Sequence, residues 1–128
     1  MILLDTSFLI ALIRKNDEKH TEAENILGQV KERTVITDHV LSELITFLVC
    51  RDGNKTAYEV GKKIIDSDII IVSVLHEDLS AALGCVGKYN GFSMCDALSI
   101  IVMQKLGIKK IASFDSDFDR IKNIERLY

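Results

Sequence analysis

The chain has 128 residues, 48% of which are hydrophobic, and it carries a formal net charge of −3. This length and composition suit a single domain, residues 1–128, whose core needs neither disulfides nor metal ions for its stability. The slightly acidic balance excludes a broadly basic surface, so a nucleic-acid ligand would be held by local basic patches or through metal ions.

The cysteines and the N-terminal residues indicate the compartment. Cys50, Cys85 and Cys95 are widely spaced among apolar residues, which predicts reduced, buried thiols rather than a disulfide frame or a zinc site. The apolar N-terminal stretch is interrupted by Asp5 and lacks both a basic segment and a cleavage site, so it is not a signal peptide. No apolar run is long enough to span a bilayer. We therefore expect a cytoplasmic protein.

The first half of the chain alternates short apolar strands with amphipathic helices. The helix after the first strand can be capped by Thr6 or Ser7, and Thr37-Asp38 can cap a later one. In chain order, the predicted elements are a strand at 2–4, a helix at 6–14, a helix at 20–30, a strand at 35–36, a helix that stops at 51–54 and a helix at 56–65.

The second half continues the alternation. The clearest strand is residues 69–72, and because it is fully apolar we expect it in the centre of the sheet. Ser93 can cap a helix that is apolar almost all round and ends at Gly107. In chain order, the predicted elements are a strand at 69–72, a helix at 77–89, a helix at 94–106, a strand at 110–114, a short helix after 116 and an edge strand at 124–128.

This alternation predicts an α/β fold, a three-layer sandwich with a mostly parallel sheet of four to five strands flanked by helices. Ligands of such sheets bind outside the carboxyl ends of the strands. Asp5 and Asp115 both follow strands, so they should emerge at the same edge. Asp96 lies in the first turn of the buried helix, at a similar depth. Glu43 lies at the border of an apolar helical stripe, beside the core.

Four carboxylates that converge on one pocket would not all ionise unaided, because like charges raise one another's pKa. A divalent cation removes this conflict, and an all-oxygen site favours one or two Mg²⁺ or Mn²⁺ ions. Two such ions ~3.5–4 Å apart would suit phosphodiester hydrolysis, in which one ion activates water and the other steadies the leaving oxygen.

The pattern resembles PIN-domain nucleases, and especially the small VapC-type toxins of prokaryotic toxin–antitoxin pairs. The resembling stretches are ILLDTSFLIAL, ITDHVLSEL and FSMCDALSIIVMQKLGIKKIASFDSDFDRI, and the length of the chain also fits. The resemblance implies an endoribonuclease with an acidic magnesium or manganese site, RNA as substrate, a cognate antitoxin as partner and a homodimer.

The resemblance also implies roles for individual residues. Carried over by position, the metal-binding and catalytic acids are Asp5, Glu43, Asp96 and Asp115, and Asp117 matches a more variable fifth acid. Two small hydroxyl residues, Thr6 and Ser113, match positions that often orient the acids. Asp119 matches no position of the pattern. Separately, Arg14, Lys15 and Arg120 follow elements that start at the acidic edge and could hold RNA phosphates.

Simpler interpretations exist for each acid alone. Asp5 could only start a helix, and Ser93 with Asp96 resembles a capping box. Glu43 could be an ordinary border residue, and the three aspartates of FDSDFD could be a solvated helix N-terminus, which we favour for Asp119. The D-x-D-x-D spacing does not make an EF-hand, because Arg120 and Arg126 stand where that loop needs glycine and glutamate.

Three other functions fit the composition. An RNA-processing nuclease outside any toxin pair would share the same chemistry, and a catalytically idle module would bind protein or RNA without cutting. A signalling receiver domain has a similar length and an acidic magnesium site. It needs a phosphoacceptor aspartate after its third strand, where this chain has Ser73.

Overall fold

All five strands of the sheet run parallel. The computed structural model describes residues 1–128 and has the strand order β3-β2-β1-β4-β5. The strands are β1 (Ile2–Leu4), β2 (Thr34–Thr37), β3 (Ile70–Val72), β4 (Lys110–Ala112) and β5 (Glu125–Leu127). Because every strand is parallel to its neighbours, all five carboxyl ends lie at one edge of the sheet. The predicted α/β sandwich is confirmed.

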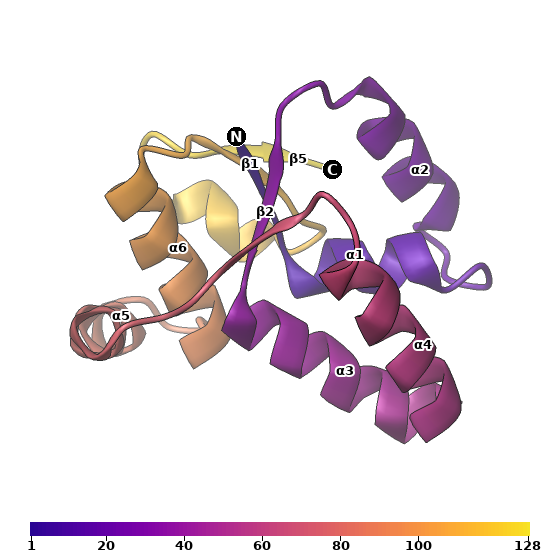
Figure 1. The fold of residues 1–128 in the computed structure, drawn as a ribbon. Helices are drawn as coiled ribbons and strands as arrows, with labels where there is room; N and C mark the ends of the chain where they lie inside the picture. The colour runs from indigo at the N-terminus through magenta and orange to yellow at the C-terminus, as the bar shows by residue number, and fades with distance from the viewer.

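Helices connect the strands and cover both faces of the sheet (Figure 1). They are α1 (Thr6–Ile13), α2 (His20–Gln29), α3 (Asp38–Asp52), α4 (Asn54–Ile65), α5 (His76–Lys88) and α6 (Met94–Leu106), with a 3₁₀ helix, η1 (Ser116–Arg120). None of them is both long and apolar enough to cross a membrane.

The core follows from the alternation of side chains along β1. Ile2 and Leu4 point to the face covered by α1, α3 and α4, where they join the larger apolar cluster. Leu3 points to the opposite face and packs with residues of α6 and η1, among them Ile100 and Phe118. All three residues of β1 are buried, because it is the central strand and helices cover both of its faces.

The structure corrects three local predictions. The strand predicted at 69–72 is not central, because β3 forms one edge of the sheet and its side chains are only half-buried. An apolar strand sequence indicates that helices cover both faces of the strand. It does not indicate whether the strand has a neighbouring strand on each side. The cap of α1 is Asp5, not Thr6 or Ser7. The cysteines are not buried as predicted, because Cys50 is exposed and Cys85 and Cys95 are only half-buried. The short helix predicted after 116 is present, as a 3₁₀ helix.

Several predicted boundaries are confirmed by the geometry of the helix ends. Thr37 Oγ1 accepts a hydrogen bond from the Val40 N–H and so caps α3. Ser93 and Asp96 form a reciprocal capping box at the start of α6. Gly107 ends α6 in the left-handed conformation, with a φ of 67°, which glycine adopts without a steric cost.

Leu44 fixes α3 against the sheet and thereby places its neighbour Glu43. Its side chain is fully buried. We predict that Leu44→Ala lowers the free energy of unfolding by ~2–5 kcal/mol, because the cavity it leaves can relax only in part. Urea denaturation measures this. Leu83→Ala, a matched change at a side chain that is 64% exposed, should leave stability nearly unchanged, and equal losses in the two variants would contradict the assigned packing.

Candidate active site

The four predicted acids meet in one cavity at the carboxyl edge of the sheet. The cavity has a volume of about 320 Å³ and is lined by Asp5, Thr6, Ser7, Ile10, Glu43, Phe47, Ser93, Asp96 and Asp115. Five elements supply these residues: the loop after β1, α1, α3, the start of α6 and the loop after β4. The convergence expected from the order of the strands is therefore present in the fold.

Asp5 is the most buried of the four acids, with 3% of its surface exposed. Its Oδ2 atom accepts hydrogen bonds from the Ser7 hydroxyl at 2.6 Å, the Ser113 hydroxyl at 2.8 Å and the Ser7 N–H at 3.3 Å. The last of these bonds caps α1. Asp5 therefore caps a helix and lines the cavity at the same time, so the two interpretations of its role are compatible.

Glu43 is positioned by a residue of α1. The Thr6 hydroxyl donates to Glu43 Oε2 at 2.5 Å and so joins α1 to α3 across the cavity. The Cys95 thiol lies beside the same carboxylate, and burial together with Glu43 raises the pKa of this thiol. Cys95 is thus a neutral, half-buried neighbour of the site rather than a nucleophile.

Backbone amides hold the remaining two acids. The Ser93 N–H donates to Asp96 Oδ2 at 2.9 Å within the capping box of α6. Asp115 caps η1, and its Oδ1 accepts a hydrogen bond from the Asp117 N–H at 2.8 Å. Both side chains are fixed by local structure, and both belong to the wall of the cavity.

One feature is common to the four acids. Each has one oxygen held by a hydroxyl or an amide of the chain, namely Asp5 Oδ2, Glu43 Oε2, Asp96 Oδ2 and Asp115 Oδ1. No N–H or O–H group of the chain donates to the other oxygen of any of them. Four carboxylates anchored in this way leave four oxygens available to a ligand, which is the donor set that Mg²⁺ and Mn²⁺ prefer.

The acids do not form a preassembled metal cage. No three His, Cys, Asp or Glu side chains lie close enough together to bind one ion jointly. The donor set nevertheless fits a hard cation that keeps several of its waters, as Mg²⁺ does when one or two carboxylates bind it directly. The residues present are therefore compatible with a divalent ion held partly through water.

The arrangement raises the pKa of two of the four acids. Burial raises the pKa of Asp5 above its ordinary value of 3.8, although the Ser7 and Ser113 hydroxyls oppose the shift. Burial also raises the pKa of Asp96, and the charges of Asp5 and Asp115 add to this effect. Both acids thus resist ionisation in the folded chain unless a cation compensates them.

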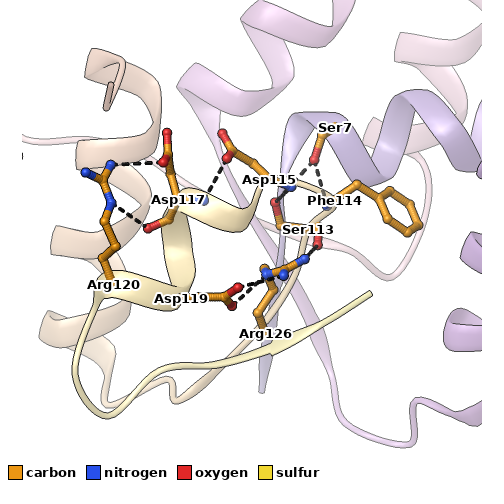
Figure 2. A network of polar contacts seen from close by, with 8 residues as sticks. All are labelled: Ser7, Ser113, Phe114, Asp115, Asp117, Asp119, Arg120 and Arg126. Carbon is orange, nitrogen blue, oxygen red and sulfur yellow. Dashed lines mark hydrogen bonds and ion pairs between the residues drawn. The ribbon is translucent and has the colours of Figure 1, made fainter. Parts of the chain in front are cut away.

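Asp117 and Asp119, which follow Asp115 at alternate positions, belong to ion pairs beside the cavity (Figure 2). Asp117 binds Arg120 at 3.1 Å and is not part of the cavity wall. Asp119 binds Arg126 through two hydrogen bonds of 2.8 Å. It therefore has a partner within the chain, which agrees with its matching no site acid of the family pattern. The Arg126 guanidinium holds the pKa of Asp119 below its usual range.

Arg126 also connects the edge strand β5 to the site. Its Nη1 atom donates to the carbonyl oxygen of Ser113 at 3.1 Å (Figure 2). The Ser113 hydroxyl donates to Asp5. The Ser7 hydroxyl in turn accepts a hydrogen bond from the Phe114 N–H at 3.1 Å. The loop after β4 is therefore held from both sides, by α1 and by β5.

The basic residues considered as phosphate contacts differ in their surroundings. Arg14 forms a two-point ion pair with Asp52 and lies near Phe47, a residue of the cavity wall. Arg120 is bound to Asp117 and covers the ring of Phe92. Lys15 is exposed and has no ion pair within the chain.

Sequence reasoning missed Ser7 and Arg126 as parts of the site. Ser7 was considered only as a helix cap, yet it contacts Asp5 and the loop after β4. The signal was its place two residues after the strand-ending acid, where a short hydroxyl side chain can reach back to that acid. Arg126 carried no comparable signal, because its role depends on the pairing of β5 with β4.

The raised pKa of Asp5 should make the stability of the metal-free chain depend on pH. Because the folded chain binds the Asp5 proton more tightly than the unfolded chain does, stability without metal falls as pH rises from 3.8 through the raised pKa. Asp5→Asn removes the buried charge and should raise the melting temperature at neutral pH in EDTA by a few degrees. Scanning calorimetry with and without Mn²⁺ tests this.

Manganese should stabilise the wild-type chain more than Asp5→Asn, since an ion bound to the folded state adds to its stability. Glu24→Gln is a control for the loss of one charge, because Glu24 is an exposed residue of α2. If Asp5→Asn melted below the wild type in EDTA, or if Mn²⁺ stabilised both equally, the assigned electrostatics would be wrong.

Comparison with known proteins agrees with this geometry. A family model described as the PIN domain matches residues 2–124. The 23S rRNA-specific endonuclease VapC20 of Mycobacterium tuberculosis is 28% identical over 127 residues, 98% of this chain and 97% of that protein. A VapC ribonuclease of Aquifex aeolicus is 29% identical over 128 residues, 94% of this chain and 92% of that protein.

Solved structures show the same fold. The crystal structure of M. tuberculosis VapC20, a toxin that cleaves the sarcin–ricin loop, has a TM-score of 0.87 at 28% identity and covers 93% of each chain. A toxin–antitoxin complex from Klebsiella pneumoniae has a TM-score of 0.75 at 16% identity, with 100% of this chain and 98% of that chain covered, which is a likeness of fold alone. Because the family model spans nearly the whole sequence, this chain belongs to the PIN domain family.

Proposed function

We propose that this chain is a metal-dependent endoribonuclease and the toxin of a toxin–antitoxin pair. The observation that supports it most strongly is the convergence of Asp5, Glu43, Asp96 and Asp115, each with one anchored and one available oxygen, in one cavity of a PIN domain. The relatives with similar sequence are named as VapC ribonucleases, and similar folds occur in toxin–antitoxin complexes.

The proposed reaction is hydrolysis of an RNA phosphodiester bond that leaves a 5′ phosphate and a 3′ hydroxyl. One or two Mg²⁺ or Mn²⁺ ions, when bound, supply charge neutralisation and an acidified water. The four acids hold the ions directly or through water. Thr6 orients Glu43, whereas Ser7 and Ser113 orient Asp5 through its Oδ2 atom.

The hydroxyl groups of the cavity do not act as nucleophiles in this scheme. The Ser7 hydroxyl is engaged by Asp5 and the Phe114 N–H, and the Ser93 hydroxyl accepts from the Asp96 N–H. Both bonds serve to position carboxylates. Arg14, Lys15 and Arg120 are proposed contacts of the RNA backbone. Asp117 is a proposed outer ligand of the metal, and its carboxylate stays paired with Arg120 until a substrate or an ion displaces the Arg120 side chain.

The proposed partner is a cognate antitoxin that blocks the acidic cavity by inserting a chain segment, with an arginine against the carboxylates. An RNA-processing nuclease outside a toxin pair shares this chemistry, and an adjacent antitoxin gene distinguishes the two. We also propose a homodimer, which light scattering on the purified chain tests. An idle binding module is less well supported, since all four acids are present and oriented.

RNA cleavage tests the proposed activity. The purified chain, free of any bound partner, should cut RNA with Mn²⁺ or Mg²⁺ and not with EDTA. Asp5→Asn and Asp96→Asn should each reduce the rate by ~10²-fold or more, because each removes a charge that holds the ion or the developing charge of the reaction. The products should carry 5′ phosphates, which a phosphate-dependent exonuclease detects.

Asp68→Asn serves as the matched control, because Asp68 is an exposed aspartate without an ion pair that precedes β3, at the edge of the sheet opposite the cavity. It should retain most of the activity. Cleavage that persists in EDTA, or equal losses in Asp5→Asn and Asp68→Asn when both are folded, would rule out the assignment of the acids.

A further inference from the structure

The cavity has one apolar wall, formed by Ile10 of α1 and Phe47 of α3. Phe47 lies one turn beyond Glu43 on α3, so that both side chains project from the same face of the helix. The Phe47 ring is half-buried and is therefore accessible from the cavity. The residues that flank this ring are basic, although the cavity itself is lined by acids.

Two guanidinium groups converge on the Phe47 ring. The Arg14 Cζ atom lies 5.6 Å from the ring centroid, and the Arg51 Cζ atom lies 5.7 Å from it. Arg51 is one further turn along α3, so Glu43, Phe47 and Arg51 form a row at positions i, i+4 and i+8. Arg14 follows the end of α1, and α1 packs against α3 (Figure 1).

The two arginines are held differently. Asp52 binds Arg14 through Nε at 3.1 Å and Nη2 at 3.3 Å, which fixes the Arg14 guanidinium beside the ring. Arg51 is exposed and forms no ion pair within the chain. Two cations at one ring repel each other, and one acid compensates only one of them. The remaining positive charge, that of Arg51, faces solvent beside the cavity, where it can attract an anionic ligand.

We propose that Arg51 and Arg14, held by Phe47, form a clamp for the phosphates of single-stranded RNA on the α3 side of the cleavage site. This inference rests on the proposed ribonuclease function and names how its substrate is held. Guanidinium groups bind phosphate oxygens in a two-point geometry, and Phe47 is a positioning residue that keeps them beside the carboxylates. The clamp attracts the RNA backbone, which the four acids alone would repel.

The test measures RNA binding in a background that cannot cut. In Asp96→Asn, the anisotropy of a labelled single-stranded RNA of mixed sequence is titrated in magnesium at several salt concentrations. Arg51→Gln should weaken binding roughly three- to tenfold and reduce the slope of log K against log salt by about 0.7, as expected for one lost phosphate contact. Phe47→Leu should weaken binding similarly, because it leaves both guanidinium groups unsupported.

Arg33→Gln is the matched control. Arg33 is also exposed and without an ion pair, but it precedes β2 at the opposite edge of the sheet. It should leave affinity and salt slope unchanged. Arg51→Lys should restore part of the salt slope, which separates a charge effect from a loss of fold. If Phe47→Leu lowers the melting temperature, only the Arg51→Gln result is used, because Arg51 is exposed and its substitution does not disturb the core.

The outcome distinguishes the two proposals when wild-type cleavage is measured beside it. If the wild type cuts RNA and Arg51→Gln binds as tightly as Arg33→Gln, the clamp is refuted and the ribonuclease stands. If Arg51→Gln weakens binding but the wild type cuts no RNA with any metal, the clamp stands as an RNA-binding surface and the proposed function fails.

Discussion

Four carboxylates converge at one edge of a parallel sheet, and the hydrogen bonds around the cavity serve to keep them there. Burial opposes the ionisation of Asp5 and Asp96, and their neighbours are acids rather than bases. The fold tolerates this because hydroxyl and amide donors fix one oxygen of each carboxylate. The same donors leave the opposite oxygens free, so the arrangement that stabilises the acids also prepares them for a cation.

The neighbouring elements maintain that arrangement. Arg126 of the edge strand β5 holds both Asp119 of η1 and the carbonyl oxygen of Ser113 (Figure 2). The Ser113 hydroxyl in turn reaches Asp5. The Thr6 hydroxyl likewise links α1 to α3 through Glu43. These contacts join segments from both ends of the chain, which explains why so small a domain can keep four like charges at fixed positions.

Much of the fold and of the site could be predicted from the sequence, because strands followed by acids fix where those acids emerge in a parallel sheet. Capping patterns placed Thr37, Ser93 and Gly107 correctly. The place of β3 at the edge could not be predicted, because an apolar composition indicates that helices cover a strand but not where the strand lies in the sheet. The partners of Asp119, Ser7 and Arg51 depend on contacts between distant segments, which no local pattern encodes.

We propose that the four carboxylates bind a divalent cation through the oxygens that no N–H or O–H group of the chain engages. The most direct measurement is anomalous diffraction from crystals of the purified chain grown with Mn²⁺. We expect a manganese peak in the cavity, within bonding distance of Asp5 Oδ1 and with the other three acids as direct or water-mediated ligands. A cavity without a peak at saturating Mn²⁺, or a peak only at Asp117 and Asp119 outside the cavity, would contradict it.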